Sequence, residues 1–525
     1  MKKYIKILFA SVLFAALIIG ASSCTKDLEQ IPITDETSAN LYPDFNNYHG
    51  LLAKVYTSLA VSGQTAGDGN PDISGLDGGM QNYTRMYFIM QDITTDEVVN
   101  GWNDGTLPTL VQMTWTPSSE FVNAMYNRLY VIMSFANEFI RNTTDDKLGG
   151  YGLSGDNLAE AKYMRAEARF IRAFVCYDLL DLFGNAPYMT EADMPGMTVP
   201  KQTSRAELYN FVETELLAVA DELKAPGTNE YGRVDQAAAW ALLAKLYLNS
   251  QVYVNQDRNS DVITYCNKII SSGKYSLKPV YAQLFMADND KNNPEVIFPI
   301  CFDGTYIQTY GGSTYMVCAA VGGSMTPADL GISGGWAGNR VTQQFVDLFD
   351  PTDIRGNFYT DGQNKEVATL GSFSDGYAFV KYSNKTSAGA NGSNATYCDA
   401  DIPVFRLADV YLMYAEAVLR GGGGDMNTAL GYVNALRSRA GTSALTSSSS
   451  MTLNFILDER ARELSWESTR RTDLIRFGKF TTNDYLWAWK GGVAAGQAVD
   501  NSKNLFPIPA SVLTGNPNLQ QNPGY

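Results

Sequence analysis

Apolar residues recur at helical spacing in several long segments of this chain. The clearest are 118–141, 158–183, 204–223, 235–250, 259–273, 402–421, 426–441 and 454–468. In each segment, residues three and four apart form one broad apolar face, which is typical of amphipathic helices. Alanines stand where two helices of a pair would cross closely, for example Ala166, Ala168 and Ala173. The pattern predicts a mostly α chain of tetratricopeptide-like helical hairpins, within about 118–273 and 402–468, without a regular repeat of about 34 residues.

Two long inserts between these helices have a different composition. Residues 62–116 and 274–400 are rich in Gly, Ser, Asn, Asp and aromatic residues and show few helical patterns. Their aromatic content is too high for disorder, so we expect short strands and ordered turns. Loops held on a rigid scaffold often carry binding residues, so we expect the ligand site in these inserts. Residues 41–525 are therefore interpreted as a single domain.

The amino terminus has the parts of a secretory signal. Positive residues in MKKYIK precede the apolar run ILFASVLFAALIIG, and ASSC follows. The run is shorter than the roughly 20 residues that a membrane-spanning helix needs. Cys24 after small residues is typical of a lipoprotein cleavage site, with plain secretion as the alternative. We predict a signal peptide over 1–23, lipid modification of Cys24 and a polar tether over 24–40, which would anchor the protein without spanning the membrane.

Charge, histidine and cysteine content exclude several functions. The net charge is −15, and an acidic surface repels phosphate backbones, so no nucleic-acid partner is expected. The chain has one histidine, His49, which excludes multi-histidine zinc or iron sites. No two cysteines have CxxC spacing, so a zinc knuckle or redox motif is not indicated. Cys176 and Cys266 fall in helical apolar patterns and are expected in the core, while disulfide pairing among the others stays open.

One short segment has the alternating oxygen side chains that calcium prefers. Asp288, Asp290 and Asn292 in ADNDKNN resemble the first half of an EF-hand loop. Asn293 stands where that loop needs glycine, and Pro299 stands where it needs a bidentate glutamate, so the segment is not an EF-hand. It is a candidate structural calcium site, with a solvated acidic turn as the alternative. No other cofactor is expected.

Several longer segments, spread over the chain in a fixed order, carry a family resemblance. They are the Cys24 lipobox, AEARFIRAFVCYDLLDLFGNAPY (166–188), RVDQAAAWALLAKLYLN (233–249), FRLADVYLMYAEAVLRG (405–421), ERARELSWESTRRTDLIRFGKF (459–480) and LFPIPASVLTGNPNLQQNPGY (505–525). Together they resemble the SusD/RagB family of surface glycan-binding lipoproteins, over essentially the whole chain after Cys24. Insert segments such as YGGSTYMVC (310–318) and ATYCDADIPVFRLA (395–408) are similar to the starch-binding members.

The resemblance implies an aromatic ligand site. In the starch-binding members, an arc of aromatic side chains cradles the curved surface of an α-1,4-glucan. By local context the arc here is Trp102, Tyr310 and Trp336, and Arg85 matches a polar contact to sugar hydroxyls. A sugar ring has an apolar C–H face, which a flat aromatic side chain can cover, and a rim of hydroxyls that polar side chains can bond.

One family position departs from the pattern in this sequence. The family has an asparagine shortly after the first tryptophan, and that position falls at Gly105 here. We expect the nearby Asn103 or Asp104 to replace its contact with sugar hydroxyls. The departure affects the polar contacts and leaves the aromatic arc as predicted.

The resemblance also implies capture of a glycan without chemistry on it. The expected protein is an outer-membrane lipoprotein that faces the outside, binds starch or maltooligosaccharide and delivers it to a SusC-type TonB-dependent transporter. Other surface glycan-binding lipoproteins and an amylase are further expected partners. A receptor for a different glycan and a purely structural helical scaffold are alternatives. A glycoside hydrolase is a remote alternative, for which Asp92, Asp96, Glu97 and Asp104 lie close to Trp102 in the sequence.

Overall fold

The computed structural model describes residues 37–194, 196 and 199–525, so the predicted signal peptide and Cys24 lie outside the described residues. The helices are α2 (Ser38–Leu41), α3 (Tyr48–Ala60), α4 (Tyr83–Phe88), α5 (Leu107–Val111), α6 (Glu120–Asn142), α7 (Asp145–Gly150), α8 (Gly155–Leu182), α9 (Arg205–Glu222), α10 (Gln236–Leu248), α11 (Ser250–Val254), α12 (Asn259–Ser271), α13 (Gly312–Cys318), α14 (Gln343–Val346), α15 (Leu407–Leu419), α16 (Met426–Arg439), α17 (Leu453–Leu464), α18 (Arg470–Arg476) and α19 (Ala510–Gly515). The strands are β1 (Gly63–Thr65), β2 (Gly69–Pro71), β3 (Val99–Asn100), β4 (Val296–Ile300), β5 (Asn339–Arg340), β6 (Phe358–Tyr359), β7 (Ala378–Phe379) and β8 (Ile402–Arg406).

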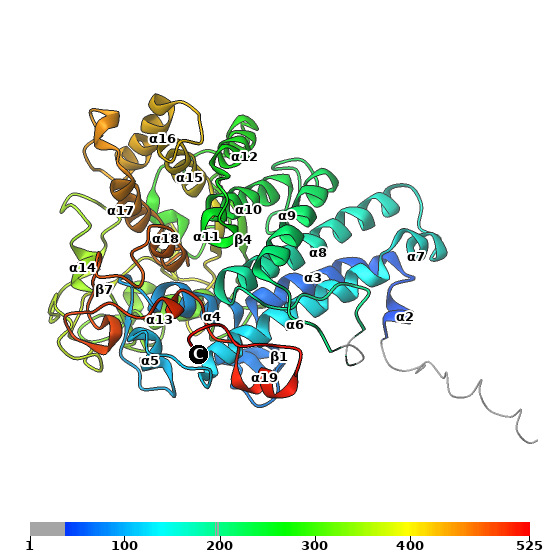
Figure 1. Cartoon of the computed structure of the whole chain (residues 1–525), viewed down its shortest axis with the longest axis horizontal. Coiled ribbons are helices and arrows are strands. Elements are labelled where there is room, and N and C mark those ends of the chain that lie inside the picture. Colours follow the sequence, from blue (N-terminus) through cyan, green and yellow to red (C-terminus); the bar gives the residue numbers. More distant parts are fainter. Residues whose placement is uncertain (1–36, 195, 197–198) are drawn as a thin grey trace, which may run out of the picture.

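The long helices stack one on the next. Helix α3 packs on α6, α6 on α8 and α8 on α9, and the succession continues through α10, α12, α15 and α16. Figure 1 shows this series passing from α7 and α8 on the right to α16 and α17 at the upper left. Because each helix buries faces against neighbours on both sides, the apolar positions form one continuous core. Cys176 and Cys266 are buried in it, as predicted. The predicted fold class is confirmed.

Local capping signals fix where several helices begin. Ser204 and Glu207 form a reciprocal capping box at the start of α9. The carboxylate of Asp235 accepts hydrogen bonds from the backbone N–H groups of Ala237 and Ala238 at the start of α10. These bonds satisfy donors that have no partner within the helix, so the amino ends of the helices lie close to the predicted positions. At the other end of the predicted tether, Ser38 already belongs to α2, and its hydroxyl donates to Glu138 at 2.6 Å.

The prediction that 402–421 is helical throughout is wrong at its start. Residues Ile402–Arg406 form strand β8, which pairs antiparallel with β4, and α15 begins only at Leu407. The partner strand lies more than 100 residues earlier in the chain, so no local periodicity could reveal the pairing. The β4–β8 sheet joins a strand within the second insert to the segment that directly follows the insert.

The predicted helix 454–468 also ends early, at Leu464. Trp466 and Ser468 have left-handed φ angles of 59° and 58°, which no helix continues through. Their backbone N–H groups donate to carboxylates in the first insert, at Glu97 (2.9 Å) and Asp92 (3.1 Å) respectively. Distant acceptors therefore override the local helical pattern.

The two inserts pack together at one end of the helical array, at the lower left of Figure 1. Hairpin β1–β2 belongs to the first insert and sheet β6–β7 to the second. The antiparallel pair β3–β5 joins the inserts, with Val99 opposite Arg340 and Asn100 opposite Asn339. The structure thus brings together residues from segments that lie more than 200 positions apart in the sequence.

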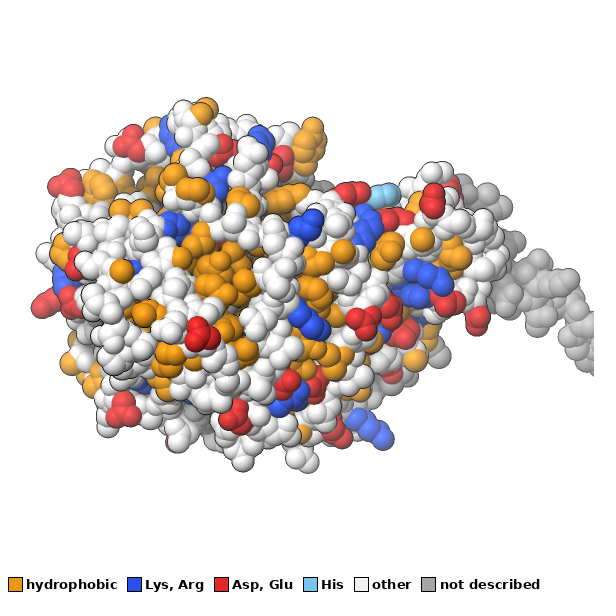
Figure 2. All heavy atoms as spheres, turned by 90° about the horizontal axis from the view of Figure 1, so that it is seen from above, with side chains coloured by type: hydrophobic (Ala, Val, Ile, Leu, Met, Phe, Trp, Pro, Cys, Tyr) orange, Lys and Arg blue, Asp and Glu red, His pale blue; other side chains and the backbone are white. Residues whose placement is uncertain are grey.

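The outer surface of the helical array is of mixed charge. On the face shown in Figure 2, acidic and basic side chains are interspersed, and a group of hydrophobic side chains gathers near the middle.

Across the described part of the chain, no helix has both the length and the apolar character needed to cross a bilayer.

Candidate functional site

The β3–β5 pair brings two predicted site residues side by side. Trp102 follows β3 and Trp336 precedes β5. Because the two strands are antiparallel, both residues lie at the same end of the pair. The indole N–H of Trp102 donates to the backbone oxygen of Trp336 at 3.0 Å. The two ring centroids are 6.3 Å apart and the ring planes differ by 47°.

The loop that carries Trp336 is held by the carboxyl end of α13. The backbone N–H of Trp336 donates to the carbonyl of Cys318 at 2.7 Å, and that of Ala337 donates to Val321 at 2.9 Å. The last carbonyls of a helix have no N–H partner within the helix, and the N–H groups of this loop act as donors at this end of α13. Trp336 is therefore positioned by a backbone network and not by its own side chain alone.

Tyr310 extends the row of rings on the other side of Trp336. Its ring centroid lies 6.2 Å from that of Trp336, with an angle of 57° between the planes, and 39% of Tyr310 is exposed. Asp68 fixes the loop, because its buried carboxylate accepts from the Tyr310 backbone N–H and the Thr309 hydroxyl, both at 2.8 Å. We call Trp102, Trp336 and Tyr310 the aromatic arc.

Arg85 lies beneath the arc on helix α4. The cap of this helix is Asn82, whose side-chain oxygen accepts from the Arg85 backbone N–H at 3.2 Å. The Arg85 guanidinium lies 5.8 Å from the Trp102 ring and 4.8 Å from the Tyr315 ring, so it stacks in the manner of a cation–π contact. One guanidinium nitrogen donates to the carbonyl of Gly79 at 3.3 Å. These contacts give Arg85 a fixed orientation.

All six residues predicted to contact ligand line one open hollow of about 720 Å³. They are Arg85, Trp102, Asn103, Asp104, Tyr310 and Trp336. The glycine-rich turn at 77–79 and the tip of hairpin β1–β2 complete its wall. The hollow combines flat apolar rings with carboxylate, amide and guanidinium groups, a combination that suits a ligand with both an apolar face and hydroxyls.

Sequence reasoning missed a partly exposed aromatic neighbour of the arc, Tyr397. The ring of Tyr397 lies 5.4 Å from that of Tyr310, at 49°, and its hydroxyl donates to the Tyr310 hydroxyl at 3.4 Å. This hydrogen bond, together with partial burial, raises the pKa of Tyr397 to about 12, so the ring stays neutral. The segment ATYC carried a family resemblance, but nothing local distinguished this tyrosine from a core residue.

The structure gives a physical reason for glycine at position 105. Gly105 has a φ of 47°, and a Cβ atom there would overlap a carboxylate oxygen of Glu120. The same Glu120 oxygen accepts from the Thr106 backbone N–H at 2.7 Å, so displacing Glu120 would break that bond. An asparagine is therefore excluded here without rearrangement, while Asn103 and Asp104 stand exposed in the hollow.

The predicted calcium segment lies outside the hollow. Asp288 accepts hydrogen bonds from the backbone N–H and the hydroxyl of Ser387, at 2.7 and 2.6 Å. Within 37–194, 196 and 199–525, no three His, Cys, Asp or Glu side chains are grouped as they would be around a metal ion. Calcium binding by Asp288, Asp290 and Asn292 stays a prediction.

Three carboxylates considered for hydrolysis are buried away from the hollow. Asp92, Asp96 and Glu97 are at most 1% exposed, and Asp96 forms a two-pronged ion pair with Arg470 at 2.8 Å. Burial raises the pKa of Asp92 to about 8, despite the hydrogen bond from the Ser468 backbone. Of the four acids considered, only Asp104 lines the hollow.

Comparison with known proteins agrees with this architecture. A family model described as "SusD family" matches residues 355–525, and one described as "Starch-binding associating with outer membrane" matches residues 75–248. The curated relative "Starch-binding protein SusD" of Bacteroides thetaiotaomicron is 36% identical, over 100% of this chain and 99% of that protein. "SusD-like protein P2" of Formosa agariphila is 25% identical, over 100% of both chains.

Solved structures share the fold at lower sequence identity. A SusD superfamily protein from Bacteroides vulgatus superposes with a TM-score of 0.70 at 22% identity, over 92% of this chain and 99% of that one. Surface glycan-binding protein A from Bacteroides thetaiotaomicron, solved in complex with laminarihexaose, superposes with a TM-score of 0.68 at 21% identity, over 91% and 99%. With the full-length match to a relative at 36% identity, these findings establish that the chain belongs to the SusD family.

Proposed function

We propose that this protein binds α-1,4-glucan of the starch type on the aromatic arc and does not alter it chemically. The observation that carries the proposal is the row of three rings from Trp102 through Trp336 to Tyr310, at 6.3 and 6.2 Å spacing in one open hollow. The full-length relative named as a starch-binding protein supports the same ligand class.

The angles between the rings favour a curved glycan. Successive ring planes in the arc differ by 47° and 57°, so the three rings do not present one flat surface. A flat, extended glycan would stack fully on one ring at a time, whereas an α-1,4-glucan coils and turns each sugar relative to the last. Such a chain can place several C–H faces on the arc at once. Arg85, Asn103 and Asp104 then have hydroxyls within their reach at the rim.

The cellular setting is part of the proposal. Lipid modification of Cys24 would hold the protein on the outer face of the outer membrane, where it captures glucan and passes it to a SusC-type TonB-dependent transporter. The description "associating with outer membrane" of one matching family model supports this setting. The burial of Asp92, Asp96 and Glu97 away from the hollow supports the view that none of these three acids acts as a glycosidase carboxylate, because such groups must flank the bond.

Isothermal titration of the full-length chain in mild detergent against a panel of glycans tests the proposal. We expect heat of binding with amylopectin and maltoheptaose, and none with dextran, inulin or laminarin. Binding to laminarin in place of amylopectin would contradict the starch assignment and favour a receptor for another glycan. Release of new reducing ends from amylopectin would contradict the non-catalytic role.

A glycine beneath the arc offers a second test of the geometry. A Cβ atom at Gly338 would overlap the ring of Trp102, so Gly338→Ala must displace that ring. Overpacking of this kind costs about 1–3 kcal/mol, and we expect amylopectin affinity to fall about tenfold. Gly334 lies in the same loop, and a Cβ atom there would meet open space, so Gly334→Ala is the matched control and should bind normally. Equal affinities for the two variants would argue against the role of the Trp102 ring.

A further inference from the structure

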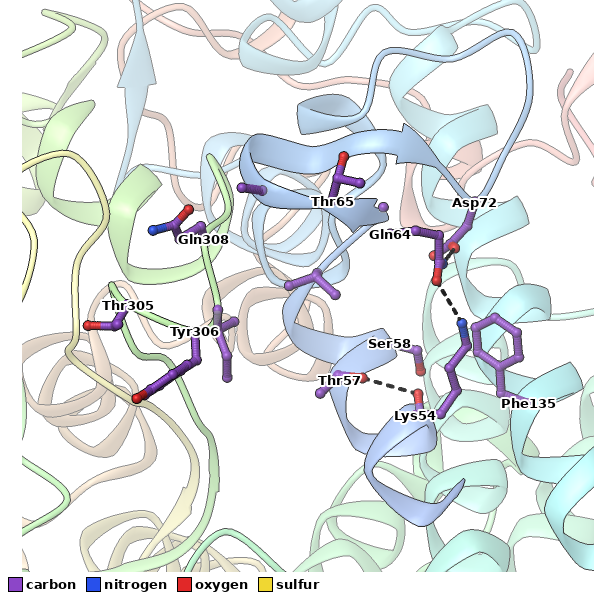
Figure 3. Close-up of a pocket in the computed structure, with 14 residues that line it drawn as sticks. Lys54, Thr57, Ser58, Gln64, Thr65, Asp72, Phe135, Thr305, Tyr306 and Gln308 are labelled. Atoms are coloured by element: carbon purple, nitrogen blue, oxygen red, sulfur yellow. Dashed lines mark hydrogen bonds between the residues drawn. The ribbon is translucent and has the colours of Figure 1, made fainter. Parts of the chain in front are cut away.

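A second groove lies against hairpin β1–β2, whose tip lines the hollow of the aromatic arc. It has a volume of about 430 Å³ and is formed by helix α3, hairpin β1–β2 and the loop around Tyr306. Figure 3 shows Thr305, Tyr306 and Gln308 on the loop side of the groove and Lys54, Ser58 and Gln64 on the helix and hairpin side, with the Tyr306 ring pointing away from the helix.

Tyr306 is the most exposed large hydrophobic side chain of the described chain. The exposed fraction is 86%, and no hydrogen bond of its hydroxyl is found among the described residues. The backbone beneath it is nevertheless fixed, because Asp303 accepts from the N–H groups of Thr305 (2.7 Å) and Tyr306 (2.9 Å). A rigid turn thus presents a large aromatic ring to solvent, and a ring presented in this way can bind with little loss of conformational entropy.

The charged side chains in this groove already have partners within the protein. Among its described lining residues, the charged side chains are Lys54 and Asp72. The Lys54 ammonium donates to Gln64 at 3.0 Å and lies 4.8 Å from the Phe135 ring. Asp72 forms an ion pair with the buried Arg128 at 2.8 Å. A charged ligand would have to compete with these contacts, so the groove favours a neutral one.

The remaining lining groups are neutral and suited to hydroxyls. The hydroxyls of Thr57 and Ser58 donate to carbonyls of their own helix, so each oxygen remains available as an acceptor. The Gln308 amide N–H donates to Gly304 at 3.2 Å, which leaves the amide oxygen available. The exposed ring of Tyr306 stands at the edge of the groove beside these neutral acceptors, so a sugar could stack on the ring while its hydroxyls reach the groove.

The groove and the arc share one rigid wall. Tyr306 and Tyr310 lie on the same loop, four residues apart, which limits their Cα separation to about 14 Å. The backbone N–H of Gly67 at the hairpin tip donates to Gln308 at 2.9 Å, and Asp68 accepts from Tyr310 at 2.8 Å. Loop and hairpin therefore move as a unit, and a continuous glucan could contact both sites.

We propose that the groove around Tyr306 is a second glucan subsite, which holds another stretch or branch of the polysaccharide whose main contact is with the arc. The inference rests on the proposed function of the arc. A chain that occupies both sites binds the second one intramolecularly, so the gain appears only for ligands long enough to reach both. Short oligosaccharides that fill only the arc do not show this gain in affinity.

The test compares the full-length wild-type chain with its Tyr306→Ala and Tyr306→Phe variants in mild detergent. We expect Tyr306→Ala to bind amylopectin about tenfold more weakly and maltotriose as well as wild type does. Tyr306→Phe keeps the ring and should keep amylopectin affinity. Tyr163→Ala, at a 37% exposed tyrosine on α8, is the control and should change neither affinity.

The other outcomes would contradict either the second subsite or the proposed function itself. Unchanged amylopectin binding by Tyr306→Ala, with binding still lost in Trp102→Ala, would overturn the second subsite and leave the arc intact. The same unchanged binding together with impaired glucan uptake by cells would overturn it in favour of a protein interface. Absence of binding to both glucans in the wild type would show that the proposed function itself fails.

Discussion

Replacing Trp102 by alanine is expected to weaken binding of starch-type glucan about 30-fold or more. An aromatic anchor of a binding site can be worth about 2 kcal/mol or more, and each 1.4 kcal/mol is a factor of ten in affinity. Trp102 also donates its indole N–H to the backbone of Trp336 at 3.0 Å, so its loss removes a ring and loosens the loop that carries the next one.

Two further variants separate these contributions. Trp102→Phe keeps an aromatic face without the indole N–H, and we expect an intermediate loss of affinity. Trp336→Ala removes one ring and keeps the backbone carbonyl that Trp102 contacts, so the loop should remain in place and affinity should fall about tenfold. Calorimetry with maltoheptaose measures each loss, and thermal unfolding checks that the variants are folded. Wild-type affinity in Trp102→Ala would rule out the aromatic arc as the binding surface.

Replacing Arg406 by alanine is expected to lower the free energy of unfolding by about 3–5 kcal/mol, because it leaves buried carboxylates without their partner. Arg406 is 1% exposed and donates to Glu295 at 2.9 Å, Glu463 at 2.6 Å and Glu467 at 2.6 Å. These groups join strand β8, the residue before β4, helix α17 and the turn after it. The network therefore connects the second insert to the carboxyl-terminal helices.

The effect of this substitution should depend on pH. Burial alone would raise the pKa of Glu463, but Arg439, Arg406 and Arg355 outweigh it and hold the pKa well below its ordinary value. The stabilisation from this group is complete above the unfolded-state pKa of about 4.3 and is lost as pH falls below it. Without Arg406, burying the carboxylates costs more free energy when they are charged than when they are protonated. The difference in Tm between wild type and Arg406→Ala should therefore be largest near pH 7 and shrink as pH falls below about 4.3.

A surface ion pair provides the comparison. Arg165 contacts Asp145 at 2.8 Å, and the Asp145 side chain is 64% exposed, so Arg165→Ala should cost at most about 1 kcal/mol. Denaturant unfolding followed by circular dichroism gives both values. Equal, small losses for Arg165→Ala and Arg406→Ala would contradict the assignment of Arg406 to the structural core.

Local sequence was enough to predict the helical scaffold, whereas the members of the arc were predicted from a family resemblance. The helices could be predicted because their apolar spacing and their capping residues, such as Ser204 and Asp235, act within a few positions of one another. Trp102, Tyr310 and Trp336 were found through a family resemblance carried by local segments. The structure brings them together in one hollow, and their contact with a ligand stays a prediction, because each could equally have been a core residue on local pattern alone.

Features that depend on distant partners became visible only in three dimensions. Strand β8 forms because β4 pairs with it, and the turn at Trp466 and Ser468 forms because Glu97 and Asp92 accept its N–H groups. The arrangement of the arc comes from loops that β3–β5 pairing, α13 and Asp68 position from separate parts of the chain. The groove at Tyr306 arises in the same way. Neighbouring residues set the preference of a segment for helix or turn, but hydrogen bonds and packing between remote segments determine which side chains meet.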